Sequence, residues 1–448
     1  MAKLRSSPQR LFWSAYTAWH ARQDAALPYW PVERLEALQN ERVCRTVRYA
    51  YDTVPYYRDL MDRERISPDQ IRTAKDLERL PIIETDELTL APERFLSSRY
   101  RPASGVTLLS SGVSGHRKSV SWNPAGLFLT LASKHRYRQV LRHYVGATYG
   151  YREMAVSNPM NVGVVLRDFY ESHAWFPSAV EFERDRAPVT QSQEEILTRV
   201  NAFRPDVLGG SGAYLGALFR YAYANDLPVH HPKVIWYGAS NMPPHDLALI
   251  ENQFGIPVIS SYQAAEMLRI GYQCEQRQGF HVCTDHVAYR VVDGGGRDVA
   301  PGETGRIVLT NLVNRGTILI NYALGDLVMQ GSGPCRCGRT LPVIDAIEGR
   351  AFDLLALPGG QRIHMDVLFK TFAHRKRIVQ LQVEQFALDR YTLRVVSDGS
   401  IAWNEMQAAM DRQVREMIAP DLQLTIERHD YLPIEALGKI KACISHIR

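Results

Sequence analysis

The chain has 448 residues, of which 45% are hydrophobic and 23% charged, and its formal net charge is +5. A chain of this length exceeds one hydrophobic core, so two or three domains are expected. Because the basic residues are spread along the chain, the charge does not favour nucleic-acid binding. The sequence contains no run of about 18 apolar residues, so no membrane span is predicted. The start lacks the pattern of a signal peptide and six cysteines do not make a disulfide framework, so a cytoplasmic protein is expected.

The first half of the chain predicts helices followed by an alternating α/β region. Residues 1–100 indicate helices with charged faces, most clearly over 31–58. Residues 105–262 alternate strand-like and helix-like segments, which is typical of a largely parallel sheet covered by helices. Strands are expected at 106–109, 160–166, 206–209, 233–237 and 257–260, and helices at 192–202, 212–225 and 244–254.

The second half changes character twice. Residues 280–348 alternate β-forming residues with glycine turns and predict a smaller antiparallel sheet, with strands near 281–282, 288–292, 305–310 and 317–322. After Arg350 the pattern becomes mixed α+β. The expected fold is therefore α/β: a large N-terminal domain (1–350) of helix-covered, parallel-type sheets with a small antiparallel β subdomain, then a small, mobile α+β C-terminal lobe (351–448).

A loop of hydroxyls and glycines follows the first expected strand. Its candidate anion ligands are Ser110, Ser111, Gly112, Ser114, Gly115 and Lys118. The hydroxyls can donate hydrogen bonds to phosphate oxygens, the glycines let backbone N–H groups turn inward as a nest, and the lysine adds a positive charge. The spacing is not that of the strand–GxxxxGK[ST]–helix phosphate loop. Taken alone, the loop is also typical of a surface turn.

The cysteines form a second pattern. Cys335 and Cys337 are a tight thiolate pair on a turn, and Cys274 and His281 precede the next expected strands. Together they make a plausible tetrahedral Zn²⁺ shell, closed and therefore structural, with Cys283 as the substitute ligand. The alternative is that these cysteines are buried small hydrophobic residues.

Six short segments occur in an informative order: 110–118, 237–240, 261–266, 322–326, 348–353 and 432–441. The ordered set resembles the adenylate-forming superfamily of acyl-CoA synthetases, adenylation domains and luciferases. A Pro-Tyr-Tyr-Arg stretch near the start and the Cys-Arg-Cys-Gly segment look most like its phenylacetate–CoA ligase branch. The resemblance spans roughly residues 50 to 441.

The resemblance implies that ATP activates a carboxylic acid, expected to be aromatic, as an acyl-adenylate with release of pyrophosphate, and that the acyl group then passes to the thiol of CoA. It assigns the loop serines and glycines with Lys118 to phosphate, Gly238, Ala239 and Ser240 to adenine, Tyr262 to stacking on the base, and Asp326 and Arg350 to the ribose. Glu266 matches the ligand of Mg²⁺, and Lys439 matches the catalytic lysine between the carboxylate and the α-phosphate. The expected acid pocket includes Tyr214, Tyr237, Gln263 and Ala264.

Several alternatives stay open within this resemblance. The acceptor can be CoA, an amine or a separate carrier protein, and a homodimer is one expected assembly; neither nucleic acid nor a membrane is an expected partner. The chain departs from the family pattern at Val113, Arg117, Ala265 and Phe352. The changes at Val113, Ala265 and Phe352 motivate a non-catalytic binding or regulatory protein on the same scaffold. The retained Asp326, Glu266 and Lys439 argue against it.

Overall fold

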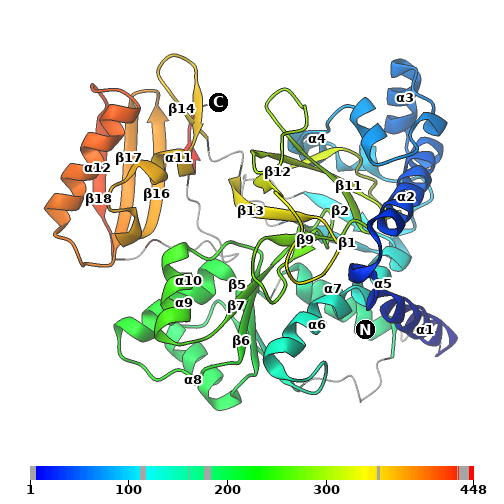
Figure 1. Ribbon diagram of the computed structural model, residues 1–448, viewed down its shortest axis with the longest axis horizontal. Coiled ribbons are helices and arrows are strands. Elements are labelled where there is room, and N and C mark those ends of the chain that lie inside the picture. Colours follow the sequence, from blue (N-terminus) through cyan, green and yellow to red (C-terminus); the bar gives the residue numbers. More distant parts are fainter. Residues whose placement is uncertain are drawn as a thin grey trace.

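The computed structural model describes residues 7–110, 118–159, 161–175, 183–350, 354–430, 432 and 443–447. Figure 1 shows a large body of helices and sheet and a separate C-terminal lobe beside it. Among the described residues, no helix is long and apolar enough to cross a membrane. The mixture of helices and sheet is the α/β fold class that the sequence predicts.

The N-terminal helices are α1 (Ser7–Asp24), α2 (Val32–Thr53), α3 (Pro55–Glu64) and α4 (Thr85–Leu90). The helix expected over 31–58 is thus two helices, with a break at Val54, whose φ of −122° and ψ of 107° are extended. Pro55 causes the break, because its ring disfavours helical backbone at the preceding residue. Pro55 then suits the first turn of α3, where no intrahelical N–H bond is lost.

A single sheet of eleven strands crosses the large body, with the strand order β10-β11-β12-β13-β9-β8-β7-β6-β5-β3-β4. Its parallel part contains β3 (Arg152–Ser157), β4 (Glu183–Pro188), β5 (Val207–Ser211), β6 (Val234–Gly238) and β7 (Val258–Tyr262). Strand β7 pairs in parallel with β6 and antiparallel with β8. The antiparallel strands therefore continue the parallel sheet, where the sequence predicted a separate smaller sheet.

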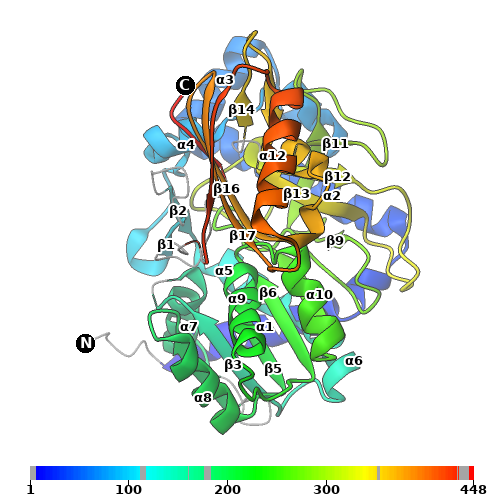
Figure 2. The ribbon, with the colours of Figure 1, turned by 90° about the vertical axis from the view of Figure 1, so that its left-hand side faces the viewer.

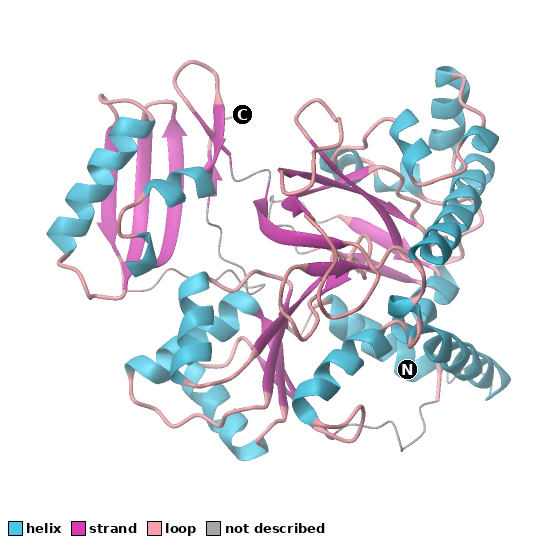
Figure 3. Ribbon diagram, in the orientation of Figure 1, coloured by secondary structure: helices cyan, strands magenta, loops and turns pink. Residues whose placement is uncertain are grey.

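Helices cover both faces of the parallel part (Figures 2 and 3). They are α5 (Pro124–Ala132), α6 (Lys134–Val145), α7 (Val162–His173), α8 (Gln193–Phe203), α9 (Gly212–Ala224) and α10 (Pro244–Gln253). On one face, Leu208 and Ile235 pack with Leu215 of α9 in an apolar cluster. On the other face, Val207 and Val234 pack with residues of α6. Alternate residues of each strand thus serve the two cores, as the two-residue period of a strand requires.

The segment expected as a strand over 160–166 is largely the helix α7, so that prediction was wrong. The side chain of Asn161 accepts a hydrogen bond from the backbone N–H of Val164 and caps the helix. Leu166, Phe169 and Tyr170 are buried at helical spacing. The run of valines favoured a strand, but the cap and the burial of one helical face determine the structure.

The antiparallel strands are β8 (Gly271–Tyr272), β9 (Phe280–Val282), β10 (Val287–Val292), β11 (Thr304–Asn311), β12 (Tyr322–Gln330) and β13 (Val343–Arg350). The strand expected at 317–322 was wrong, because β12 begins only at Tyr322. The apolar run before it is buried in irregular backbone, and isolated bridges join Thr317 to Leu96 and Tyr322 to Ile83. Its hydrophobicity reflects contact with the N-terminal segments.

The first expected strand, β1 (Val106–Leu109), is confirmed, but it pairs with β2 (Ser119–Trp122) in a two-stranded antiparallel ribbon apart from the main sheet. Leu109 lies opposite Ser119. The serine- and glycine-rich loop is therefore the connection of a hairpin, and residues 111–117 of it lie outside the described part of the chain.

The C-terminal lobe is α+β, as expected. It contains β14 (Leu354–Ala356), β15 (Arg362–His364), α11 (Met365–Thr371), β16 (Ile378–Ala387), β17 (Arg390–Ser397), α12 (Trp403–Met417), β18 (Gln423–Arg428) and β19 (Cys443–Ser445). Its apolar cluster joins Val383 and Leu393 of the sheet to Met406 of α12. Residues 351–353 lie outside the described ranges, so the domain boundary at 350 stays a prediction.

Candidate active site

A cavity of about 3060 Å³ lies at the carboxyl ends of β3, β5, β6 and β7 and extends to the β1–β2 hairpin, β12 and the C-terminal lobe. Ligands of open α/β sheets bind at this end of the strands. The sequence-predicted residues that line it are Ser110, Lys118, Tyr237, Gly238, Ala239, Ser240, Tyr262, Gln263, Ala264, Glu266 and Asp326. Segments more than 200 residues apart therefore meet around one space.

A buried ion pair joins the hairpin to the segment after β7. Lys118 Nζ lies 2.6 Å from Glu266 Oε1, and their side chains are 11% and 3% exposed. Lys118 Nζ also donates a hydrogen bond of 2.9 Å to the hydroxyl of Tyr322, which lies 3.3 Å from Glu266 Oε1. Burial, with the charge of Glu266, raises the pKa of Tyr322, so this hydroxyl stays protonated. The group holds a cation and a carboxylate in fixed positions at the base of the β1–β2 hairpin.

A second polar pair links β7 to β12. The hydroxyl of Tyr262 donates a hydrogen bond of 2.7 Å to Asp326 Oδ2. This bond orients both the aromatic ring and the carboxylate at the cavity wall. Arg350 lies opposite Asp326 in the pairing of β12 with β13, which places its backbone beside the same site.

The turn after β6 has a strained backbone. Ala239 has a φ of +63°, a left-handed conformation that side chains rarely adopt. Ser240 fixes the turn to the start of α9, because its Oγ lies 2.5 Å from Ser211 Oγ and accepts a hydrogen bond of 3.2 Å from the N–H of Ala213. A Cβ on Gly238 would lie 3.2 Å from Ser261 Oγ. The turn thus presents a flat, preorganised backbone edge to the cavity.

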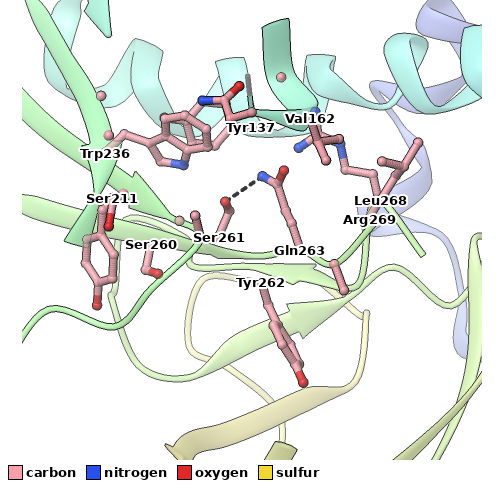
Figure 4. A pocket seen from close by; sticks show the side chains of 18 of the residues that line it. Tyr137, Val162, Ser211, Trp236, Ser260, Ser261, Tyr262, Gln263, Leu268 and Arg269 are labelled. Atoms are coloured by element: carbon pink, nitrogen blue, oxygen red, sulfur yellow. Dashed lines mark hydrogen bonds between the residues drawn. The ribbon is translucent and has the colours of Figure 1, made fainter. Parts of the chain in front are cut away.

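The four residues expected in the acid pocket divide into two groups. Tyr237, Gln263 and Ala264 line the cavity, and Gln263 donates a hydrogen bond of 2.6 Å to Ser261 Oγ. Tyr214 instead packs in the apolar cluster between the sheet and α9, because its position on that helix faces the sheet. Figure 4 shows Gln263 and Tyr262 pointing in opposite directions from the chain.

Some predicted residues lie outside the described part of the chain. These are Ser111, Gly112, Ser114, Gly115 and Lys439, together with the departures Val113, Arg117 and Phe352. The side chain of Arg350 is likewise not described. Their roles stay predictions. The departure Ala265 is described: its carbonyl accepts a hydrogen bond of 3.0 Å from the indole N–H of Trp122, which fixes the backbone just before Glu266.

Sequence reasoning missed three residues of the site. Tyr322 of β12 contacts both members of the Lys118–Glu266 pair, but the sequence marked it only as the start of the 322–326 segment. The basic residues Lys134 and Arg138 of α6 also line the cavity. Their spacing of four residues on one helix face was the available signal.

The four preferred metal ligands come together. The ligand atoms of Cys274, His281, Cys335 and Cys337 all lie within 4.8 Å of one another. The sulfurs of Cys274 and Cys335 are 3.7 Å apart, and Cys337 Sγ lies 3.3 Å from His281 Nε2. Two sulfurs on a tetrahedral zinc at about 2.3 Å are about 3.8 Å apart, so the donor set fits that ion.

The surroundings of this cluster are consistent with a metal site. His281 Nδ1 lies 3.4 Å from the carbonyl oxygen of Leu341, which leaves Nε2 directed at the cysteines. Such an outer hydrogen bond orients a ligating imidazole. The substitute ligand Cys283 is elsewhere, packed in the apolar cluster with Val140 and Tyr272.

Comparisons with known proteins find chains of similar sequence and fold. No protein-family model matches the chain. It is 26% identical over 337 residues to phenylacetate–coenzyme A ligase of Thermus thermophilus, covering 73% of each chain, and 23% identical over 429 residues to that of Pseudomonas putida, covering 92% and 91%. The fold is similar to a crystal structure of 2-hydroxyisobutyryl-CoA ligase in complex with 2-HIB-AMP, with a TM-score of 0.71 and 17% identity, covering 93% and 90%.

Proposed function

Since the chain belongs to the adenylate-forming superfamily, in its phenylacetate–CoA ligase-like branch, we propose that it activates a carboxylic acid as an acyl-adenylate and transfers the acyl group to CoA. The carboxylate attacks the α-phosphorus of ATP, and pyrophosphate leaves. The thiol then attacks the acyl carbon, and AMP leaves. The observation that carries the proposal is the meeting of the Lys118–Glu266 pair, the Tyr262–Asp326 pair and the 238–240 turn around one cavity.

The nucleotide is assigned to three of these features. The backbone edge at Gly238 to Ser240 is suited to the adenine, with Tyr262 stacking on the base. Asp326, held by the Tyr262 hydroxyl, accepts hydrogen bonds from the ribose, near Arg350. The hairpin loop from Ser110 to Lys118 receives the phosphates, where fixed donors and a cation stabilise the departing pyrophosphate.

Glu266 is the proposed ligand for Mg²⁺. A buried carboxylate is a suitable hard ligand, and Lys118 beside it supplies a second positive charge for phosphate oxygens. The ion, when bound, neutralises part of the charge on the phosphates. The buried Lys118–Glu266 pair argues against the non-catalytic alternative. Burying two charges costs free energy, and a core held together by packing alone would not need charged residues at these positions.

CoA is the proposed acceptor. The loop 359–362 of the C-terminal lobe joins β14 to β15, and its Gly359 and Gly360 have φ of +101° and +85°. An open glycine turn allows close approach of a ligand to the backbone. We assign this loop to the pantetheine arm of CoA.

Acid-dependent exchange of labelled pyrophosphate into ATP, screened over aromatic and aliphatic acids, tests the first half-reaction. We expect exchange with a subset of acids and a loss of about 100-fold or more in a Glu266→Gln variant. Glu33→Gln, at an exposed site on α2, is the matched control and keeps full exchange. No exchange with any acid, together with no binding of ATP, contradicts the proposal.

The Cys274–His281–Cys335–Cys337 cluster is proposed to hold one structural zinc. We expect about one zinc per chain in the purified protein and loss of the metal in a Cys335→Ser, Cys337→Ser double variant. The thermal midpoint falls with it, because metal-binding free energy contributes to folding. Cys44→Ser removes a thiol outside the cluster and leaves the zinc content unchanged. Elemental analysis decides, and a folded wild-type protein without zinc overturns this assignment.

A further inference from the structure

One end of the cavity is lined by basic side chains that the proposed nucleotide site does not use. We call it the basic end; its residues are Lys134, Arg138, Arg167, Arg184, Arg186 and Arg269. They come from α6, α7, β4 and the segment after β7. Two carboxylates, Glu153 and Glu171, also line this end among the described residues. Cations therefore outnumber carboxylates by six to two.

The placement of these side chains follows from the fold. Lys134 and Arg138 are four residues apart on α6 and share a helix face with Tyr137. Across the cavity, Arg184 and Arg186 are two residues apart on β4 and so share a face of the sheet. The helix and the edge of the sheet thus present cations to the same space from two sides.

Part of this charge has no carboxylate partner among the described residues. Arg184 Nε lies 3.6 Å from Glu153, which uses one of the two carboxylates. Arg186 Nε is buried without a hydrogen-bond partner in the described part of the chain. Lys134 Nζ lies 5.8 Å from the centre of the Tyr170 ring, and no carboxylate of the described residues lies within 4.0 Å of it. Lys134 and Arg186 are partly buried, and cations withdrawn from water in this way favour the binding of an anion.

The electrostatics agree with this geometry. Burial, together with the charges of Arg269, Arg138 and Arg184 and against the opposing charge of Glu153, lowers the pKa of Lys134 to about 7. Burial also lowers the pKa of Arg269. A bound anion would relieve the repulsion among these cations and favour the protonated lysine.

The basic end lies on the side of the cavity that contains the expected acid-pocket residue Gln263. Figure 4 shows Arg269 and Gln263 on the same side as Tyr137, with Tyr262 pointing away from them. Tyr137 and Trp236 pack with ring centroids 5.0 Å apart, which gives this side an aromatic wall. Gln263 and Ala264, the expected acid-pocket residues, line the same cavity. A flat acid lying along this wall has its far end among the cations.

We propose that the acid substrate carries a second anionic group, a carboxylate or a phosphate, at the end remote from the carboxylate that reacts, and that the basic end binds it. The inference rests on the proposed function for the identity of the reacting end. It narrows the substrate from any aromatic acid to a doubly anionic one. The side chains of Lys134 and Arg186 have no carboxylate partner among the described residues. They therefore determine the preference for a doubly anionic acid.

Calorimetric binding of matched acids tests the proposal without requiring turnover. The probes are phenylacetate, para-phenylenediacetate and para-(phosphonomethyl)phenylacetate, which differ in the second group. We expect at least one doubly anionic acid to bind about tenfold or more tighter than phenylacetate, because charge-assisted hydrogen bonds are added. The better of the two distinguishes carboxylate from phosphate. Equal binding of all three overturns the proposal.

Variants locate the effect. Lys134→Met and, independently, Arg186→Met are expected to reduce the binding ratio between the doubly and singly anionic acids about tenfold, while Arg142→Met, at an exposed site on α6, leaves the ratio unchanged. Thermal melts verify folding of each variant. An unchanged ratio in both variants, or a change in the affinity for CoA in place of the acid, contradicts the proposal. Pyrophosphate exchange is scored separately, so its failure refutes the proposed function and leaves the binding result to decide this inference.

Discussion

A Lys439→Ala variant is expected to lose about 100- to 1000-fold of its acid-dependent pyrophosphate exchange while still binding ATP. A point charge between the carboxylate and the α-phosphate is most useful as charge builds in the transition state, so the loss falls on the rate of adenylation. Lys439 lies outside the described residues, and Leu432 is the described residue that precedes it. The N–H of Leu432 donates a hydrogen bond of 2.9 Å to Gln380 Oε1, and Gln380 lines the cavity.

The matched control for this variant is Lys441→Ala, two residues further along the same segment. It removes an equal charge and is expected to retain most of the exchange activity. Calorimetry with ATP verifies that nucleotide binding survives in both variants. If Lys439→Ala keeps wild-type exchange, the lysine is not the catalytic group and the assignment of the C-terminal lobe to adenylation fails.

An Arg136→Met variant is expected to lose about 3–5 kcal/mol of unfolding free energy, because the buried carboxylates of Asp24 and Asp285 lose their shared arginine partner. Asp285 keeps a longer contact of 3.6 Å with Arg42. Arg136 is 1% exposed, and its two terminal nitrogens each donate a hydrogen bond of 2.7 Å to one carboxylate oxygen of Asp285. It also donates to Asp24 at the end of α1. Burial would raise the pKa of Asp285, but the charge of Arg136 outweighs it and holds that pKa below its ordinary value.

Denaturant unfolding measures this loss. Arg142→Met on the same helix removes an exposed arginine and is expected to change stability by about 0.5 kcal/mol or less. Combined replacement of Asp24, Arg136 and Asp285 by apolar residues should recover part of the loss, since none of these three buried charges remains. A single Arg136→Met variant as stable as the control would show that the pair contributes little to the fold.

The central elements of the fold could be predicted from local patterns. The helices α8, α9 and α10 and the strands β5, β6 and β7 occur within a few residues of their predicted ranges, because each buries one regular face in the same core. The errors at α7 and at 317–322 have different causes. Both segments are buried apolar runs, but the local cap at Asn161 begins a helix in the first. In the second, bridges to the distant residues Leu96 and Ile83 accompany an irregular backbone.

The candidate site was predictable to a different degree. The order of the motifs predicted that Lys118, Glu266, Tyr262 and Asp326 belong to one site, and all four line one cavity. The contacts among them depend on strand register, which the spacing in the sequence does not give. The Cys274–His281–Cys335–Cys337 cluster was predictable because cysteine and histidine are few and their spacing is informative. The basic end was not predicted, since its residues come from α6, α7, β4 and the segment after β7, and no one segment looks unusual.

The most direct test of the account uses an acid that supports exchange, labelled with heavy oxygen in its carboxylate. In the full reaction with ATP and CoA, attack of the carboxylate on the α-phosphorus moves one labelled oxygen into AMP when the thiol releases it. We predict AMP that carries one heavy oxygen, formed together with unlabelled pyrophosphate and an acyl-CoA. Formation of ADP with the label in inorganic phosphate, or of unlabelled AMP, would contradict an acyl-adenylate intermediate and with it the proposed function.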